Sequence, residues 1–306
     1  GLWLTVHDGW WWLTVINRFA LHLFAPVLII LPLALFSRRR QAIAASLIPP
    51  LVFGALYWPY FTPRLARPDQ TPSLRVMTYN VLFSNTDYEA VATVILTHQP
   101  DLVALQEVQP EMMDALVERL GETYPYSLMG DGHPYGTTAV FSRHPFLDSY
   151  VLDLKADRPA VVVKISAGGE TATFVSAHLL AYGMQWVSLA EIPATINERV
   201  FEQERQAQLL VEEVERLGGP AIVACDCNSK EASGSYRILA EAMKNAAREA
   251  RWAINAPVLA AFTLTAQTPL SATATRIFVE RVGGQTRRPL PELLQVNAYR
   301  SESWSE

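Results

Sequence analysis

The sequence predicts an α/β or α+β domain, in which helices cover a mixed β-sheet, preceded by a transmembrane helical hairpin. Two observations lead to this prediction. Apolar strand-like runs alternate with amphipathic helices from residue 74 to about residue 250, and residues 1–61 are nearly free of charge apart from one arginine cluster. A mixture of β-hairpins and helical crossovers is typical of packed layers of sheet and helix.

The N-terminal region is interpreted as a membrane anchor over residues 1–61. It contains two apolar stretches, 19–36 and 42–61, each close to the ~20 residues that cross a bilayer as a helix. Aromatic residues flank both outer ends, and three arginines at 38–40 connect the stretches. Such a basic loop favours the cytoplasmic side, so the rest of the chain is expected to be extracytoplasmic. Two apolar helices inside a soluble core are the alternative. The chain begins with Gly1, which is typical of a fragment or a processed product.

The remainder divides into a linker, a domain and an atypical C-terminal segment. Residues 62–73 hold three prolines without apolar periodicity and are read as the linker. The domain is expected over 74–252, and 253–306 follows it. Period-two and 3.6-residue patterns predict strands at 74–82, 101–107, 138–142, 150–154, 159–166, 171–178 and 221–225, and helices at 88–98, 111–120, 198–217 and 235–247.

Charge and cysteine content limit the function. From residue 72 onward there are 19 Lys or Arg and 28 Asp or Glu residues, a net charge of −9. A protein that binds nucleic acid through its phosphates usually has a basic face, so tight DNA binding is disfavoured. Cys225 and Cys227 are close in sequence and are interpreted as small buried strand residues rather than as a disulfide framework.

Side chains that can support phosphate chemistry follow successive predicted strands. They are Asn80, Glu107, His178, Asp226 and Asn228. Strand alternation points Asp226 and Asn228 the same way, and both cysteines the opposite way. A carboxylate such as Glu107 suits Mg²⁺, a histidine can stabilise or protonate a phosphate group, and amides can hold phosphate oxygens without added charge. Each residue alone also has an ordinary structural explanation. Their joint occurrence at strand ends predicts metal-assisted displacement at phosphorus.

Five successive motifs resemble those of the endonuclease/exonuclease/phosphatase superfamily, whose members include DNase I-like and exodeoxyribonuclease III-like enzymes. They are MTYNV (77–81), LQEV (105–108), FSRHPF (141–146), SAHL (176–179) and ACDCNS (224–229). The resemblance implies a four-layered sandwich of two mixed sheets and a Mg²⁺ (or Mn²⁺) cofactor.

By motif, the resemblance also implies a role for each candidate. Glu107 would bind the metal, with Asn80 supporting it or binding phosphate. His178 would be the catalytic histidine, Asp226 would orient water, and Asn228 would hold phosphate. Residues 135–137 (Tyr-Gly-Thr) are a further candidate for lining the cleft.

The family pattern breaks near the C-terminus. Its usual final Ser-Asp-His is missing, because no aspartate follows Asp226 and no histidine follows His178. The segment 253–306 shows weak strand periodicity and ends without a clear strand, as a frameshifted or divergent terminus would. Three hypotheses follow: a membrane-anchored extracytoplasmic phosphoesterase whose substrate is a lipid head group or another phosphate ester; a catalytically inactive membrane-tethered binding domain; and an extracytoplasmic nuclease.

Overall fold

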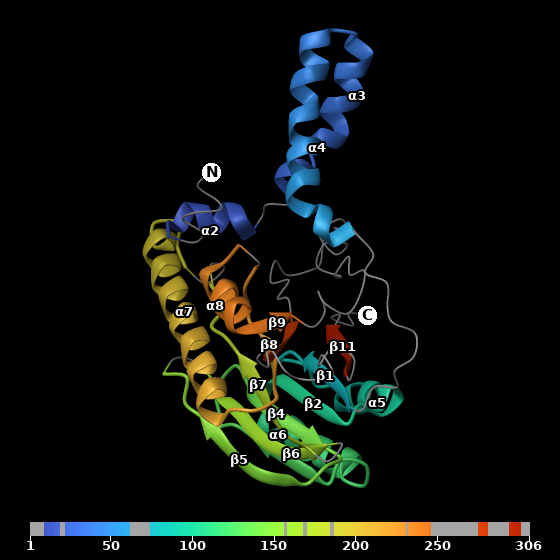
Figure 1. Ribbon diagram of the computed structural model, residues 1–306, viewed down its shortest axis with the longest axis vertical. Coiled ribbons are helices and arrows are strands. Elements are labelled where there is room, and N and C mark those ends of the chain that lie inside the picture. Colours follow the sequence, from blue (N-terminus) through green and yellow to red (C-terminus); the bar gives the residue numbers. More distant parts are fainter. Residues whose placement is uncertain are drawn as a thin grey trace.

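Two mixed β-sheets pack face to face in the computed structural model of the chain (Figure 1). The structure describes residues 9–18, 22–61, 74–155, 158–167, 170–183, 187–230, 232–245, 275–280 and 294–300. The first sheet has the strand order β11-β1-β2-β4-β3 and the second has the order β5-β6-β7-β8-β10-β9. The first sheet consists of β1 (Leu74–Asn80), β2 (Leu102–Val108), β3 (Tyr126–Met129), β4 (Thr137–Ser142) and β11 (Leu294–Arg300). The second consists of β5 (Phe146–Leu152), β6 (Ala160–Ala167), β7 (Glu170–His178), β8 (Ala221–Asp226), β9 (Met243–Asn245) and β10 (Thr275–Glu280).

Three apolar clusters make the domain a four-layered sandwich, as the sequence resemblance implied. The cluster between the sheets includes Val76, Leu102 and Phe174. A second covers the outer face of the first sheet with α5 (Tyr88–His98) and α6 (Pro110–Leu120). The third packs α7 (Ile192–Leu217) and α8 (Gly234–Ala242) on the outer face of the second sheet. Strands buried on both faces explain why β2 and β8 read as continuous apolar runs in the sequence.

Parallel strand pairs in both sheets bring the chemically important strand ends together. β1 pairs with β2 in parallel in the first sheet, and β7 pairs with β8 in parallel in the second. In the second pair His178 lies directly beside Asp226 in register. The carboxyl ends of parallel strands meet at one edge of a sheet, which is where ligand sites form in such folds.

The helices agree with the sequence patterns except at some ends. α5 covers the residues predicted, and its first turn is capped by Asp87, whose carboxylate accepts from the Ala90 amide at 2.9 Å. α7 begins at Ile192 rather than at residue 198. Its first turn contains a proline, which is compatible with a helix start because that amide has no helical partner. The helix predicted over 235–247 ends at Ala242, and β9 follows it.

The expectation that the segment 253–306 ends without a clear strand is wrong. β10 pairs antiparallel with β8, and β11 pairs parallel with β1. Both strands are completed by neighbours that lie far away in the sequence, so their own periodicity did not reveal them. The remainder of 253–306 and the predicted linker 62–73 lie outside the described residues.

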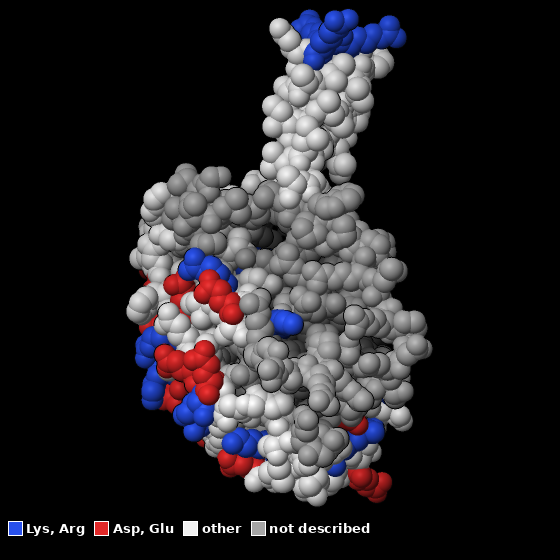
Figure 2. Space-filling model, viewed as in Figure 1, with Lys and Arg blue, Asp and Glu red and all other residues white. Residues whose placement is uncertain are grey.

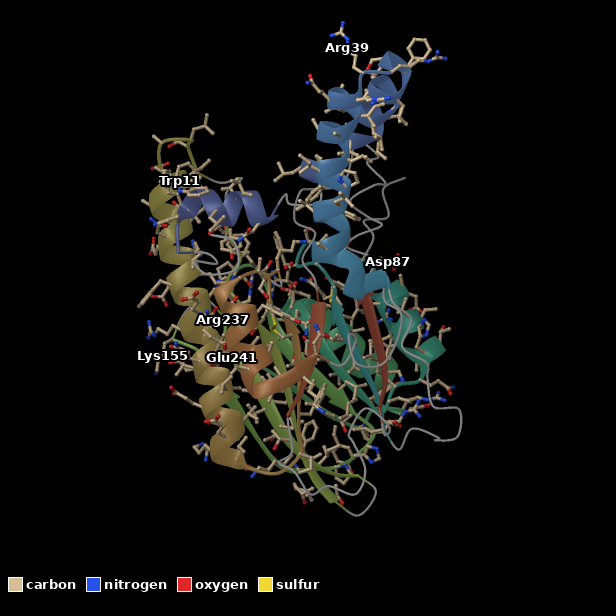
Figure 3. The ribbon with its side chains drawn as sticks, turned by 45° about the horizontal axis from the view of Figure 1, so that its top comes forward. Trp11, Arg39, Asp87, Lys155, Arg237 and Glu241 are labelled. Carbon is tan, nitrogen blue, oxygen red and sulfur yellow. A yellow bond between two sulfur atoms is a disulfide. The ribbon has the colours of Figure 1, made fainter. Side chains whose placement is uncertain are left out.

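A helical hairpin projects from one end of the sandwich (Figure 1). It consists of α3 (Val27–Ser37) and α4 (Arg40–Phe61) and is preceded by α2 (Trp11–Arg18) and a short 3-10 turn, η1 (His22–Phe24). The arginines at 38–40 lie at its tip, where Figure 2 shows a basic cap on an otherwise uncharged stalk and Figure 3 labels Arg39.

The predicted span over 19–36 is not one helix in the structure. α3 has 11 residues and starts after Pro26, whose ring nitrogen has no hydrogen to donate; residues 19–21 lie outside the description. The second predicted span, 42–61, falls within α4. Within the described part of the chain, no helix combines the length and the apolar character needed to cross a membrane.

Candidate active site

Asn80 joins the two sheets at the edge where the candidate residues meet. It ends β1, and its side-chain Nδ2 donates to Glu107 Oε1 at 2.9 Å and to Asp226 Oδ2 at 2.8 Å. Its Oδ1 accepts from the Leu82 amide at 2.9 Å, which fixes the orientation of the side chain. One neutral amide therefore holds a carboxylate of the first sheet against a carboxylate of the second.

Glu107 is held by an unusual backbone near the end of β2. Its φ is +64°, and the β2–β4 register shifts between Leu105 and Val108. A β-bulge of this kind re-aims a side chain and is common beside functional sites. Gly136 packs against this point so closely that an added Cβ would lie 2.3 Å from the Glu107 carbonyl carbon. The Phe83 amide donates to Glu107 Oε2 at 3.1 Å, so both carboxylate oxygens have a neutral donor.

Asp226 and Asn228 extend from β8 toward His178, as strand alternation predicted. Asp226 is fully buried, and its Oδ1 accepts from the Asn228 amide at 3.3 Å. Asn228 has a φ of +47°, a conformation that asparagine tolerates better than most residues. Its Nδ2 donates to the Leu179 carbonyl at 2.9 Å and lies 3.0 Å from His178 Nε2. Its buried Oδ1 has no hydrogen-bond partner within the described residues.

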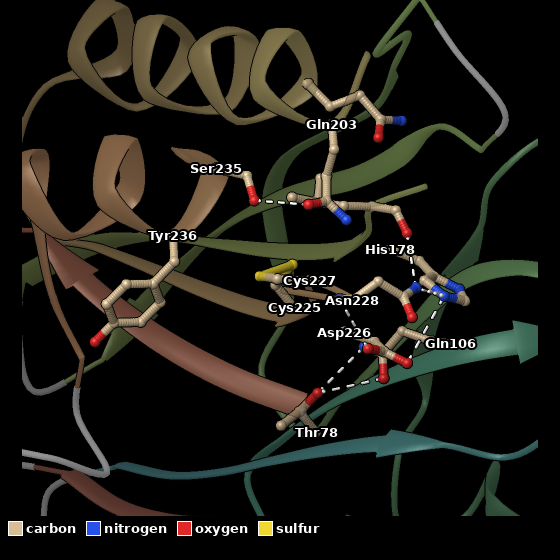
Figure 4. The surroundings of a disulfide bond; sticks show 12 residues. Thr78, Gln106, His178, Gln203, Cys225, Asp226, Cys227, Asn228, Ser235 and Tyr236 are labelled. Atoms are coloured by element: carbon tan, nitrogen blue, oxygen red, sulfur yellow. Dashed lines mark hydrogen bonds and ion pairs between the residues drawn. A yellow bond between two sulfur atoms is a disulfide. The ribbon is translucent and has the colours of Figure 1, made fainter. Parts of the chain in front are cut away.

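Cys225 and Cys227 are buried, as predicted, but they form a disulfide, so the interpretation that excluded a bridge between them is wrong. β8 ends at Asp226, so Cys227 lies just beyond the strand, and the two Cα atoms are 5.1 Å apart, within the usual range for a bridge. Both cysteines belong to the core beneath α7 and α8. Figure 4 shows the disulfide on that side of β8 and Asp226 on the other, as alternation predicted.

His178 is buried and uncharged. Burial is the main cause that holds its pKa well below the ordinary value, followed by the nearby charges of Arg158 and His133. Glu107 and Asp226 lie 3.9 and 3.7 Å from His178 Nε2, close enough to pair with a protonated ring. Desolvation outweighs that attraction because the ring is only 1% exposed. At neutral pH the imidazole therefore acts through hydrogen bonds rather than as a cation.

Arg158 is the site residue that the sequence analysis missed. Its Nη1 lies 3.2 Å from His178 Nδ1, its Nε donates to the Gly136 carbonyl at 2.9 Å, and its Nη2 donates to the Tyr135 carbonyl at 3.3 Å. The residue is 6% exposed. In the sequence it is an arginine shortly before the strand at 160–167, at the N-terminal end of that strand, whereas the other candidates lie at or after C-terminal strand ends.

The three ionisable candidates form a compact group. One ligand atom from each of Glu107, His178 and Asp226 can be chosen so that all lie within 4.8 Å of one another, which is a geometry that could hold a metal ion. Asn80 and Asn228 contact the same group. All five residues predicted from the sequence are thus brought together, and their individual roles stay predictions.

Comparison with known proteins agrees with this architecture. Residues 77–284 match the profile of the Endonuclease/Exonuclease/phosphatase family, and the chain belongs to that family. A comparison with curated protein sequences found no match.

Solved structures with low sequence identity share the fold. One is an endonuclease/exonuclease/phosphatase from Beutenbergia cavernae, with 20% identity and a TM-score of 0.52 over 69% of this chain and 64% of that one. A β-hairpin deletion mutant of beta toxin from Staphylococcus aureus has 14% identity and a TM-score of 0.51, covering 77% of this chain and 96% of the toxin. A truncated TDP2 from Caenorhabditis elegans has 14% identity and a TM-score of 0.50, covering 67% and 83%.

Proposed function

We propose that this protein hydrolyses phosphate esters, phosphodiesters first, with the help of Mg²⁺ or Mn²⁺. The observation that carries the proposal is the pair of carboxylates, Glu107 and Asp226, which a single Asn80 amide holds together beside His178. Membership of the Endonuclease/Exonuclease/phosphatase family supports the same chemistry.

The donor set fits a hard divalent cation. Carboxylate oxygens are the ligands that Mg²⁺ prefers, and Glu107 and Asp226 supply them from opposite sheets. Asn80 is a neutral neighbour, so it holds the two carboxylates together without adding a charge of its own. Glu107 would be the main ligand, with Asn80 and Asp226 beside it. When bound, the cation would polarise the phosphate and make a bound water easier to deprotonate.

The protein's own groups would position and stabilise the reacting phosphate. Arg158 is the permanent cation beside His178, and its planar guanidinium suits phosphate oxygens. Neutral His178 would form a hydrogen bond to the phosphate or to the attacking water, and Asn228 would hold a phosphate oxygen through its amide. Asp226 would orient the attacking water and accept its proton, since its carboxylate lies 3.7 Å from His178 at the same strand edge.

The test is hydrolysis of bis-p-nitrophenyl phosphate by the full chain in detergent, with Mg²⁺, with Mn²⁺ and with EDTA. We expect metal-dependent turnover that falls about 10²–10⁴-fold in Glu107→Gln. Glu111→Gln, an exposed glutamate on the next helix, is the matched control and should keep full activity. Equal background rates for wild type and Glu107→Gln would sink the enzyme proposal and favour a non-catalytic binding domain, which the missing terminal Asp-His also suggests. If the enzyme is active, DNA and phospholipid substrates separate a nuclease from a lipid phosphodiesterase.

We further propose that the hairpin attaches the protein to a lipid membrane, with the domain on the extracytoplasmic side. Leu28 and Leu51 are each 70% exposed, and they lie on a stalk whose surface is apolar up to its arginine tip. The Cys225–Cys227 disulfide supports an oxidising compartment.

Vesicle flotation tests the attachment. Leu28→Asp combined with Leu51→Asp should release the protein from vesicles. Leu189→Asp, at a position outside the hairpin that is 87% exposed, should not. If the double variant still floats with the vesicles, the hairpin is not the attachment site. Protease accessibility in intact cells tests the side: a domain protected in whole cells and cleaved only after lysis would contradict the extracytoplasmic assignment.

A further inference from the structure

Three aromatic side chains lie together beside the candidate active site. The ring of Tyr135 packs edge-on against Phe83, with centroids 5.3 Å apart, and against His133 at 5.7 Å. Tyr135 is 53% exposed, whereas Phe83 and His133 are half-buried. We call these three residues the aromatic rim. A single exposed tyrosine is ordinary on a protein surface, but this one packs against two further rings directly beside the candidate active site.

Backbone hydrogen bonds connect the rim to both halves of the site. The Phe83 amide donates to Glu107 Oε2 at 3.1 Å, and the Tyr135 carbonyl accepts from Arg158 Nη2 at 3.3 Å. Arg158 in turn contacts His178. Two of the three aromatic residues are therefore one hydrogen bond away from a group expected to act on the phosphate.

The third member of the rim is close to the same centre. The Gly136 amide donates to the His133 carbonyl at 2.9 Å, and the Gly136 carbonyl accepts from Arg158 Nε at 2.9 Å, so His133 is connected to Arg158 through one residue. The Tyr135 amide donates to His133 Nδ1 at 3.2 Å, and the Gln109 side chain donates to the Pro134 carbonyl at 2.9 Å. These bonds hold the short segment 133–135 in place, so the exposed Tyr135 ring is set in position before a ligand arrives.

We propose that Phe83, His133 and Tyr135 form a specificity subsite that binds a flat aromatic group carried by the phosphate ester. The inference rests on the proposed function, since it takes Arg158 and His178 as the phosphate end of the same site. Aromatic rings attract other rings in stacked or edge-on geometry, and Tyr135, at 53% exposure, keeps part of its side chain open to a ligand. The group bound is either the base of a nucleotide or the aryl group of a phenol ester.

The overall charge favours a small ester over a polynucleotide. The region from residue 72 onward carries a net charge of −9, which opposes the approach of a long polyanion. A single ester needs only one phosphate site, and Arg158 supplies a cation there. A quaternary ammonium group is the competing ligand, because it also binds aromatic faces through cation–π attraction. Binding of phosphocholine, compared with binding of phenyl phosphate, separates the two.

Equilibrium titration of the full chain in Ca²⁺ tests the subsite without relying on turnover. The ligands are phenyl phosphate, thymidine 5′-monophosphate, methyl phosphate and phosphocholine. Tyr135→Ala should raise the Kd of phenyl phosphate and of thymidine 5′-monophosphate about tenfold, the scale of one aromatic contact. The Kd of methyl phosphate should not change. Tyr135→Phe should bind all four like wild type. Tyr126→Ala, which removes an exposed tyrosine that packs on Phe146 at the far strand β3, is the matched control and should change nothing.

The results separate this proposal from the proposed function. Equal weakening of all four ligands by Tyr135→Ala, or a loss confined to phosphocholine, would overturn the aromatic subsite. Tyr135-dependent aryl binding without any metal-dependent hydrolysis would keep the subsite and reject the enzyme. If hydrolysis occurs, Tyr135→Ala should raise KM for thymidine 5′-(p-nitrophenyl phosphate) and leave KM for methyl p-nitrophenyl phosphate unchanged. A difference of more than tenfold between the Kd values of phenyl phosphate and thymidine 5′-monophosphate would show whether the subsite prefers an aryl group or a nucleotide base.

Discussion

The Asn80 bridge between two carboxylates leads to a sharp prediction for Asn80→Asp. The substitution keeps the shape of the side chain but replaces the donor, now 2.9 Å from Glu107 and 2.8 Å from Asp226, with an acceptor. Where the amide attracts both carboxylates, the introduced carboxyl group repels both. Asn80→Ala serves as the reference, because it removes the donor without adding charge.

The size of the effect follows from Coulomb's law. Two like charges about 4 Å apart repel by roughly 4 kcal/mol at an effective dielectric constant of 20. Two such contacts exist, but Asn80 is only half-buried and its neighbours can relax, so we expect about 4 kcal/mol in total. This corresponds to a rise of about 3 units in the pKa of the introduced carboxyl group, from about 3.9 in the unfolded chain to about 7 in the folded protein.

Because the pKa of the introduced carboxyl group is raised, the loss of stability depends on pH. A carboxyl group whose folded pKa is raised costs nothing well below its unfolded pKa, and the cost grows as the pH rises until the folded pKa is passed. The free energy of unfolding should therefore fall by about 1.5 kcal/mol at pH 5 and by about 4 kcal/mol at pH 8. In Asn80→Ala the free energy of unfolding should fall by about 1–3 kcal/mol at either pH, because the carboxylates lose a hydrogen-bond donor.

Urea unfolding in EDTA at the two pH values measures these differences. Adding Mn²⁺ should restore much of the loss in Asn80→Asp at pH 8, because a cation then compensates the third carboxylate. If the difference in unfolding free energy between the two variants is the same at pH 5 and pH 8, the electrostatic account of the bridge is wrong.

Two further predictions concern other positions. Gly136→Ala should lower the free energy of unfolding by at least about 2 kcal/mol and weaken Mn²⁺ binding, since its φ of +73° is unfavourable for alanine and the new Cβ would collide with Glu107. Gly132→Ala is the control, because no atom lies within 4 Å of its added Cβ, and it should change neither quantity. Equal losses of unfolding free energy in the two variants would contradict the reasoning. Glu213→Gln tests pH dependence. The hydrogen bond from Arg216 holds the pKa of Glu213 below its usual value. The stability that this carboxylate contributes to the folded protein is therefore fully present above its unfolded pKa of about 4.3, and it is lost as the pH falls below that value. The variant should be less stable than wild type at pH 7, by up to about 1 kcal/mol, and the gap in urea midpoint should narrow at pH 4; a gap that is constant with pH would speak against this pairing.

Much of the site could be predicted because its residues follow strands with strong local patterns. Glu107 lies near the end of a continuous apolar run, and Asp226 directly follows another. His178 ends a clear hairpin strand. Parallel pairing then forces such strand ends to one edge, whatever the detailed packing. The period-two rule also assigned Asp226 and the cysteines to opposite faces of β8 correctly.

What could not be predicted depends on contacts distant in sequence. Arg158 precedes its strand, and only the folded sandwich brings it beside His178. β11 forms a strand because it pairs in parallel with β1, and the sequence pattern of its own residues does not indicate this pairing. The disulfide could not be predicted from strand alternation, because two residues of an extended strand span about 6.6 Å. β8 ends between the cysteines, at Asp226, and their Cα atoms are only 5.1 Å apart.

The short spacing of that disulfide decides what it can stabilise. Loop-closure entropy grows with the number of residues enclosed, and a loop of about three residues gives only about 1.6 kcal/mol, against about 4.7 kcal/mol for one of 100 residues. The link between Cys225 and Cys227 therefore restrains the unfolded chain very little. Its effect is instead confined to the peptide that carries Asp226, whose backbone stays in a small covalent ring even when the surrounding sheet opens.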